Sequence, residues 1–192
     1  MSNPSTTADD ILRCARTLIV RGGYNSFSYA DISDVVGIRK ASIHHHFPSK
    51  SDLVRVLVVQ YREEAQAGIA ELERNVPDPL GQLRAYVGYW ERCIADASHP
   101  FCVCALLASE IEVLPEAVAF EVRAHFRWLS DWIASVLERG AAHGRLSLSS
   151  TARGDAEMFM ATVHGAMLSA RAYGDATAFG AVTHPLLERI AV

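Results

Sequence analysis

Every long stretch of this sequence repeats its apolar side chains with the period of an α-helix. No stretch alternates apolar and polar residues as a half-buried strand does. Glycine and proline interrupt the pattern and divide it into segments of helical length. The sequence therefore predicts an all-α fold of about nine helices. They are expected at residues 8–21, 29–36, 40–47, 51–75, 79–97, 101–113, 116–143, 151–173 and 177–190.

Residues that favour helix ends stand where these segments begin and stop. Thr7 and Ser28 are the expected N-caps of the first two helices, and Gly37 is expected to end the second in a left-handed conformation. Asp78 followed by Pro79 marks another start. The inward-facing residues predicted for the first two helices are Ile11, Ala15, Leu18, Ile19, Ile32, Val35 and Val36.

Composition indicates a globular protein, since 50% of the residues are hydrophobic and 21% are charged. The longest charge-free run in the apolar part, Met158 to Ala170, is shorter than a membrane span. The first ten residues are polar and acidic, without the apolar core of a signal peptide. We therefore expect a cytoplasmic protein with no membrane partner, whose cysteines are thiols.

The segment from Ser28 to Phe47 has the anatomy of a helix-turn-helix. Ser33 lies four residues before Gly37, where two steeply crossing helices need a small side chain. Ile43 lies six residues after Gly37, where the second helix must be anchored in the core. This spacing predicts that the second helix is the one that enters the major groove of DNA.

The outward face of that second helix carries small and hydrogen-bonding side chains, while Ile43 and Phe47 share its inward face. No acidic residue lies between Asp34 and Asp52, although the net charge of the chain is −4. Basic side chains in this window, and residues at the flanking helix starts, are placed to contact phosphates. The candidate DNA-binding residues are Ser28, Tyr29, Arg39, Lys40, Ala41, Ser42, His44, His45, His46 and Lys50.

The three consecutive histidines also suit a metal site in residue type, but their geometry is against it. Successive helical side chains diverge by about 100°, so they do not converge on one ion. No phosphate-binding glycine loop, HExxH or GxSxG motif is present. We expect no metal, no cofactor and no enzymatic activity; a helical enzyme and a dimerisation module without DNA binding are the weaker alternatives.

The chain resembles the TetR/AcrR family of bacterial transcriptional regulators. The resemblance rests on Gly22-Gly23-Tyr24, Ser28-Tyr29-Ala30-Asp31-Ile32, Val36-Gly37-Ile38 and Ser42-Ile43-His44-His45-His46-Phe47-Pro48-Ser49-Lys50. The family usually has tyrosine at one or both of the positions of His44 and His46. The resemblance implies a three-helix DNA-binding domain, a ligand-binding domain, a homodimer formed by the last two long helices, and a repressor released by a small molecule.

The resemblance sets the expected domains at residues 1–54 for DNA binding and 55–192 for ligand binding and dimerisation. A stripe of mostly small residues supports the dimer, because it permits close approach of two helices. Periodicity alone does not say whether this stripe packs within one chain or between two. A symmetric dimer would read a palindrome-like operator. The candidate dimer residues are Ala161, Gly165, Leu168 and Ala172.

Aromatic and sulfur-containing residues concentrate after residue 85 and predict an apolar effector pocket with a few polar groups. The candidate effector residues are Tyr86, Tyr89, Trp90, Cys93, Cys104, His125, Phe126 and His164. A thiol sensor is the alternative, with Cys102 and Cys104 near a helix start and Cys93 as their partner. The other interpretation of these cysteines is that they are small buried core residues.

Overall fold

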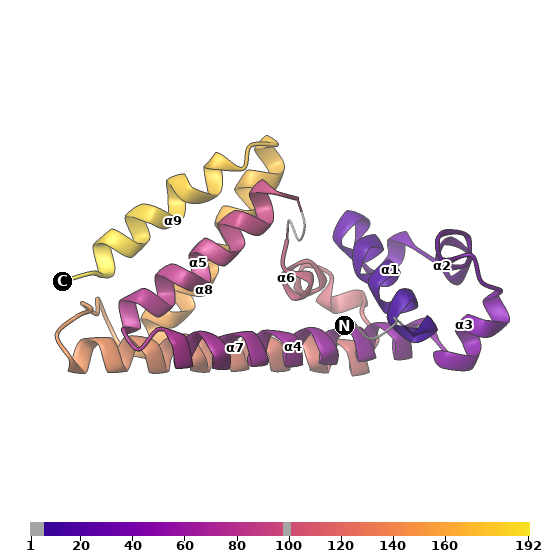
Figure 1. Cartoon of the computed structure of the whole chain (residues 1–192), viewed down its shortest axis with the longest axis horizontal. Coiled ribbons are helices and arrows are strands. Elements are labelled where there is room, and N and C mark those ends of the chain that lie inside the picture. Colours follow the sequence, from indigo (N-terminus) through magenta and orange to yellow (C-terminus); the bar gives the residue numbers. More distant parts are fainter. Residues whose placement is uncertain (1–5, 98–100) are drawn as a thin grey trace. The chain divides into compact units, whose positions relative to one another are not determined.

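The computed structural model describes residues 6–97 and 101–192, and these residues form nine α-helices and no strand (Figure 1). The predicted all-α fold is confirmed. The helices are α1 (Thr7–Gly22), α2 (Tyr29–Val36), α3 (Lys40–His46), α4 (Lys50–Asn75), α5 (Pro79–Ala95), α6 (Val103–Ala108), α7 (Glu116–Ala142), α8 (Ala152–Tyr173) and α9 (Thr177–Ile190). Two short 3-10 helices, η1 (Tyr24–Ser26) and η2 (Ile111–Val113), complete the set.

The helix ends follow the sequence signals closely. Ser28 and Asp31 form a capping box at the start of α2, and Gly37 ends that helix at φ 75° and ψ 30°. The N-cap of α1 is Thr6 and not Thr7 as predicted, because Asp9 completes a capping box with the Thr6 backbone. Asp78 accepts a hydrogen bond from the Gly81 N–H at 2.7 Å and caps α5.

Two expectations about these helices are wrong. Residues 101–113 form α6 and η2 and not one helix; the Ser109 hydroxyl donates to the Leu106 carbonyl at 2.6 Å, which competes with continued helical bonding. Val35 was expected to face inward, but its side chain is 69% exposed. It belongs to the last turn of α2 and lines the open groove between α1 and α2.

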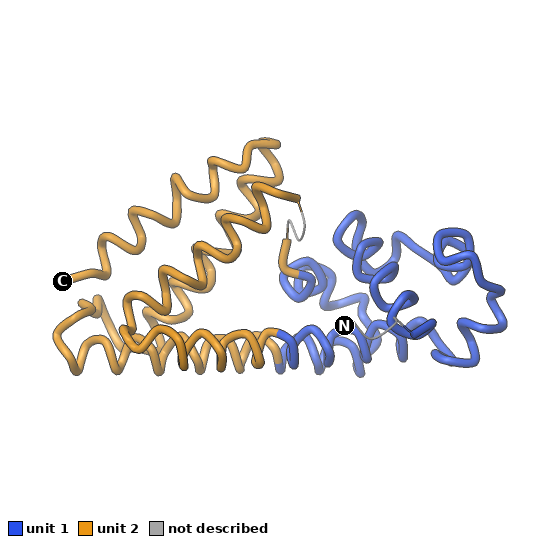
Figure 2. The backbone as a smooth tube through the Cα atoms, viewed as in Figure 1, with its two compact units in different colours: residues 1–64, 103–124 blue, residues 65–102, 125–192 orange. Residues whose placement is uncertain are grey.

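The chain divides into two compact units (Figure 2). Unit 1 comprises residues 1–64 and 103–124, and unit 2 comprises residues 65–102 and 125–192. This division differs from the expected one at residue 54, because α4 continues as one helix to Asn75 and α6 packs against α1. Unit 1 therefore contains more than the three N-terminal helices.

Unit 1 is built around fully buried aliphatic side chains from each of its N-terminal helices, including Ile11, Ile32 and Ile43. Polar contacts tie the later segment of the unit to this bundle. Glu110 accepts a hydrogen bond from the Tyr24 backbone N–H at 2.7 Å, and Arg62 pairs with Glu121 at 2.7 Å. Residues far away in the sequence therefore contact the segment before α2 and the helix that follows α3.

In unit 2, α5 and α8 both run antiparallel to α7. Gln82 and Tyr86 on α5 contact Arg139 and Trp132 on α7, so the residue numbers rise on one helix as they fall on the other. The same reversal relates α8 to α7, since Glu157 contacts Ser130 and His164 contacts Phe126. Consequently α5 and α8 run parallel to each other (Figure 1).

The conformation of Gly23 makes a prediction about the stability of unit 1. Gly23 has φ 85° and ψ −173°, a region that is almost restricted to glycine, and an added Cβ would lie 1.8 Å from the Glu110 Oε1 atom. We expect Gly23→Ala to lower the free energy of unfolding by about 2–3 kcal/mol, as measured by urea denaturation.

Gly68→Ala is the matched control, because Gly68 lies inside α4 with open space around its Cβ position. There the same change is expected to stabilise the protein by about 0.5–1 kcal/mol through helix propensity. Equal effects at the two positions would contradict the role assigned to Gly23.

Candidate DNA-binding and effector sites

The recognition helix α3 has only seven residues and is held in place by its inward face. Ile43 is fully buried and Phe47 nearly so, as the sequence predicts. The Tyr29 hydroxyl donates a hydrogen bond to the Phe47 carbonyl at 2.9 Å, which fixes the end of α3 to the start of α2. The N-cap residue, Arg39, makes no side-chain capping bond, so tertiary contacts hold this helix in place.

The turn between α2 and α3 is closed by Ser33. Its backbone carbonyl accepts the Gly37 N–H at 2.9 Å, and its hydroxyl donates to the Ile38 carbonyl at 2.5 Å. The small side chain that the spacing requires is therefore also a hydrogen-bond donor across the turn. This bond orients α3 relative to α2.

Most of the predicted DNA-binding side chains lie on the solvent face of unit 1. Ser42 is half-buried, and the Ser28 hydroxyl is engaged by the Asp31 carboxylate at 2.7 Å. His44 packs edge-on against the Tyr29 ring, with the centroids 4.8 Å apart. The remaining side chains are exposed and available to a partner; they are Arg39, Lys40, Ala41, His44, His45 and His46.

The His45 and His46 rings contact each other edge to face, with their centroids 5.6 Å apart. Among the described residues, no group of three histidine, cysteine, aspartate or glutamate side chains is placed to hold a metal ion. Both side chains are exposed, so the two rings form part of the polar surface of α3.

Tyr29 does not occupy the exposed position predicted for a phosphate contact. Its ring is buried, and its hydroxyl is used by the Phe47 carbonyl. Burial, followed by the charge of Asp52, raises the pKa of Tyr29 to about 12. The side chain is a structural link between α2 and the end of α3.

Lys50 also differs from the prediction, which had its amine reaching a phosphate. The Lys50 Nζ atom donates to the Phe27 carbonyl and lies over the Phe27 and Tyr24 rings, 4.1 and 4.8 Å from their centroids. Burial lowers the pKa of Lys50, while the charges of Asp31 and Glu110 oppose this shift. Sequence reasoning missed this aromatic cage. The signal that could have predicted it is the presence of two aromatic residues, Tyr24 and Phe27, in the short segment before Ser28.

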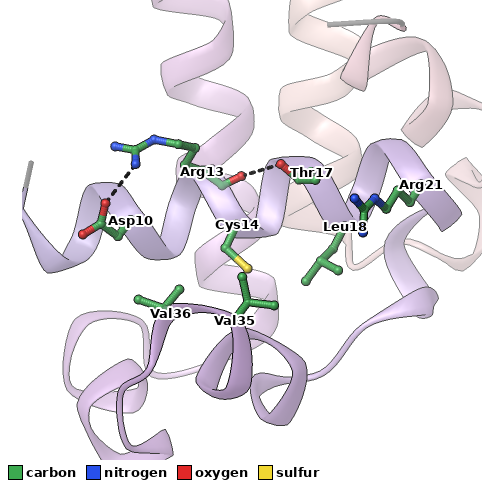
Figure 3. Close-up of a pocket in the computed structure, with 8 residues that line it drawn as sticks. All are labelled: Asp10, Arg13, Cys14, Thr17, Leu18, Arg21, Val35 and Val36. Atoms are coloured by element: carbon green, nitrogen blue, oxygen red, sulfur yellow. Dashed lines mark hydrogen bonds and ion pairs between the residues drawn. The ribbon is translucent and has the colours of Figure 1, made fainter. Parts of the chain in front are cut away.

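A groove of about 460 Å³ lies between α1 and the end of α2 (Figure 3). Cys14, Leu18 and Val35 contribute apolar atoms to it, and Arg13, paired with Asp10 at 3.0 Å, lies at its edge. Burial raises the pKa of the Cys14 thiol, and the charge of Asp31 adds to this effect. Cys14 therefore stays protonated and is a weak nucleophile.

In unit 2 the structure brings several predicted effector residues into two groups of ring contacts, one around Tyr86 and one around His164. Tyr86 lies 5.5 Å from Trp132 and 6.5 Å from Phe159, measured between ring centroids. Phe126 lies 5.4 Å from His164 in the same way. Trp132 and Phe159 were not among the candidate residues, because their helical spacing is the same as that of ordinary core residues.

Tyr89, Cys93 and Cys104 are placed apart from these two groups. Tyr89 is 45% exposed, and its ring lies edge-on to that of Trp90, with the centroids 5.2 Å apart. Cys93 is buried on α5. Cys104 belongs to unit 1, whereas the other candidates belong to unit 2. All four cysteines are buried thiols, which favours the interpretation as core residues over that as sensors.

The predicted dimer stripe on α8 lies on the surface. Its four residues, Ala161, Gly165, Leu168 and Ala172, are all exposed, and Leu168 is 57% accessible. A Cβ added at Gly165 would meet nothing within 4 Å. The stripe therefore does not pack within the chain, and packing between two chains is the alternative that agrees with its exposure.

In the described part of the chain, no helix is long and apolar enough to cross a membrane. A short second helix with an exposed basic face, set behind a glycine turn, is the arrangement with which helix-turn-helix proteins read the major groove. The fold and the α2–α3 site together define a helix-turn-helix DNA-binding protein.

Comparison with known proteins identifies the family. Residues 11–57 match the family model described as bacterial regulatory proteins, tetR family, and residues 79–185 match the one described as tetracyclin repressor-like, C-terminal domain. The chain belongs to the TetR family of DNA-binding transcriptional regulators, as the resemblance in its sequence suggested.

Individual relatives agree with this assignment. A TetR-family transcriptional regulator from Agrobacterium tumefaciens is 77% identical, with a TM-score of 0.96 over 99% of this chain and 100% of its own. A TetR transcriptional regulator from Legionella pneumophila is 27% identical, with a TM-score of 0.88 over 98% and 100%. The HTH-type transcriptional repressor KstR2 of Rhodococcus jostii is 29% identical over 74% of this chain and 69% of its own.

The contrasting environments of the two lysines make a second prediction. Lys50 is held by the Phe27 carbonyl and two rings, whereas Lys40 is exposed on α3. We expect Lys50→Met to lower the free energy of unfolding by about 1–2 kcal/mol, from the lost charged hydrogen bond and cation–π contacts. Lys40→Met should leave stability within about 0.5 kcal/mol of wild type and weaken DNA binding.

Thermal and urea denaturation measure the first effect, and fluorescence anisotropy with labelled duplex DNA measures the second. A Lys50→Met variant that keeps full stability but loses DNA binding would instead identify Lys50 as a phosphate contact.

Proposed function

We propose that the protein is a homodimeric repressor that holds a palindrome-like operator through two copies of α3. The observation that carries this proposal is the exposed face of α3, with Arg39, Lys40 and the three histidines but no acidic side chain. Such a face suits both phosphates and base edges in the major groove. The similarity to a relative named as a transcriptional repressor supports repression over activation.

We further propose that a small apolar or aromatic effector binds in unit 2 and releases the operator. The ring contacts of Tyr86 on α5 and of His164 on α8 support an effector of this kind. On this proposal the protein acts by binding and not as an enzyme. The buried thiols give no support to the alternative of a thiol-sensing repressor.

The first test concerns the recognition face. The operator is obtained by selecting duplexes bound by the purified protein from a pool of random sequences. We expect His45→Ala to weaken binding to the selected site by about tenfold at fixed salt, as loss of a base contact does. Binding is measured by fluorescence anisotropy.

His143→Ala is the matched control, because His143 is equally an exposed histidine but lies just after α7, outside unit 1. It should bind the operator like wild type. Equal losses of affinity in both variants, or an unchanged affinity in His45→Ala, would show that α3 does not provide the recognition face.

The second test concerns the dimer. Leu168→Glu places a charge on the exposed stripe of α8, where symmetry would bring it close to its own copy. We expect the dissociation constant of the dimer to rise at least about a hundredfold, and binding to the palindrome-like site to fall with it. Sedimentation velocity across a concentration series measures the change.

Val113→Glu is the control for this variant. Val113 is 62% exposed, similar to Leu168, but it lies on η2 in unit 1. It should leave the dimer intact. A Leu168→Glu variant that sediments like wild type would place the dimer contact elsewhere.

A further inference from the structure

The imidazole ring of His44 is held in place on the surface of unit 1. Its Nδ1 atom lies 3.2 Å from the Pro48 carbonyl oxygen, within hydrogen-bond distance. The ring also packs edge-on against Tyr29, with the centroids 4.8 Å apart. The side chain is nevertheless exposed, and among the described residues no hydrogen bond uses its Nε2 atom. One ring nitrogen of His44 is therefore engaged within the chain, and the other is left for a partner.

The Pro48 contact decides which proton the His44 ring carries. A carbonyl oxygen only accepts, so the Nδ1 atom must supply the proton of this hydrogen bond. In a neutral imidazole the other nitrogen, Nε2, then has no proton and acts as an acceptor. His44 can therefore donate a hydrogen bond from Nε2 only after the ring has taken up a second proton and become an imidazolium.

The position of His44 favours the DNA backbone as its partner. The ring contacts Tyr29, the first residue of α2, and so lies where the start of α2 meets α3. In helix-turn-helix proteins the helix before the recognition helix crosses the DNA backbone. A side chain at this junction is placed to meet a phosphate and not a base edge. A phosphate oxygen only accepts, so a neutral His44 ring would meet it with a second acceptor.

Charges of both signs surround this ring. Lys40 precedes His44 by one turn on α3, and its positive charge disfavours a second one in the free protein. Asp52 of α4 acts on the Tyr29 hydroxyl, which stays neutral because its pKa is raised to about 12. His45 and His46 are exposed and contact each other. The charge that would favour an imidazolium at His44 is therefore one that the DNA brings.

The helices that pack against α3 add no ion pair to the His44 ring. These helices are α1 and α2. In the described part of the chain, none of their charged side chains is hydrogen-bonded or ion-paired to this ring. These side chains are Asp9, Asp10, Arg13, Arg16 and Arg21 on α1, and Asp31 and Asp34 on α2.

We propose that His44 binds an operator phosphate as an imidazolium, with Nδ1–H on the Pro48 carbonyl and Nε2–H on a phosphate oxygen, so that operator binding takes up a proton. This inference rests on the proposed operator-binding face of α3. The proton comes from the solvent, and the phosphate keeps its single negative charge. That charge favours the imidazolium and strengthens the hydrogen bond. Because free imidazoles are largely neutral above about pH 7, the proton enters on binding and affinity falls as the pH rises.

The test measures operator affinity between about pH 6 and pH 8 with the full chain. The operator is selected at the lower end of this range, so that a required proton does not prevent its recovery. Fluorescence anisotropy is recorded at fixed ionic strength, because salt alone changes DNA affinity. We expect the dissociation constant to rise about tenfold from the lower to the higher pH, as a charge-assisted hydrogen bond is lost.

His44→Tyr removes the titrating group but keeps a ring and a hydrogen-bond donor. A tyrosine hydroxyl stays protonated throughout this pH range. We therefore expect the change in the dissociation constant to fall from about tenfold to about threefold or less. His46→Tyr is the matched control, because it makes the same change on the same helix at an exposed residue outside the Pro48 contact. It should keep the change of about tenfold, whatever its affinity at a single pH.

Two further readouts follow the proton itself. Titration calorimetry in two buffers of different ionisation enthalpy counts the protons taken up, and the count should be about half a proton per protomer higher for wild type than for His44→Tyr near pH 7.5. A ¹⁵N spectrum of the histidine rings should show the proton of free His44 on Nδ1 alone, and protons on both nitrogens once DNA is bound.

The outcomes separate this proposal from the proposed function. An operator bound equally well at both ends of the pH range, or a pH dependence that persists in His44→Tyr, would overturn the proton uptake and leave operator binding intact. Failure to recover any bound duplex would overturn both. A scrambled duplex should show the same pH dependence, because phosphates are present in every sequence. A dependence confined to the operator would move the Nε2–H bond to a base and overturn the phosphate contact.

Discussion

The burial of Ile43 and Phe47 is the contact on which the DNA-binding unit depends. A helix of seven residues is not stable alone, because the cost of starting a helix exceeds what so few hydrogen bonds return. The inward face therefore holds α3 in place, with the Tyr29 hydroxyl closing its end. On the outward face, His44 packs against the Tyr29 ring, while the exposed Lys40, Ala41 and His45 are left for a partner.

The two units differ in how completely their buried polar groups are hydrogen-bonded. In unit 1 the polar groups near the helix-turn-helix have partners: Ser33 across the turn, Lys50 on the Phe27 carbonyl, and Glu110 on the Tyr24 N–H. A fixed recognition helix requires such closure, because a loosely held helix would lose orientational freedom on each binding event. In unit 2, the buried Nε2 atom of His164 has no hydrogen-bond partner among the described residues.

Local signals in the sequence predicted the fold well. Gly37 and the Asp78-Pro79 pair fixed helix ends because their backbone preferences act without tertiary help. The burial of Ile43 followed from its spacing alone. The roles of Tyr29 and Lys50 did not, since a polar group at a helix start points outward or inward according to neighbours that lie elsewhere in the chain. Glu110 is the clearest case. It accepts a hydrogen bond from the backbone N–H of Tyr24, 86 residues away in the sequence, and no periodicity relates the two positions.

The negative net charge connects the dimer to DNA binding. With a total charge of −4, the chain as a whole gains little from long-range attraction to phosphates, so binding must come from the local basic window. One such window supplies few contacts. Linking two copies makes the second contact intramolecular and raises the affinity without any new interaction. In the proposed dimer, the small residues on the surface of α8 and the basic residues on α3 would both contribute to the affinity, so weakening either face would weaken binding to a symmetric site.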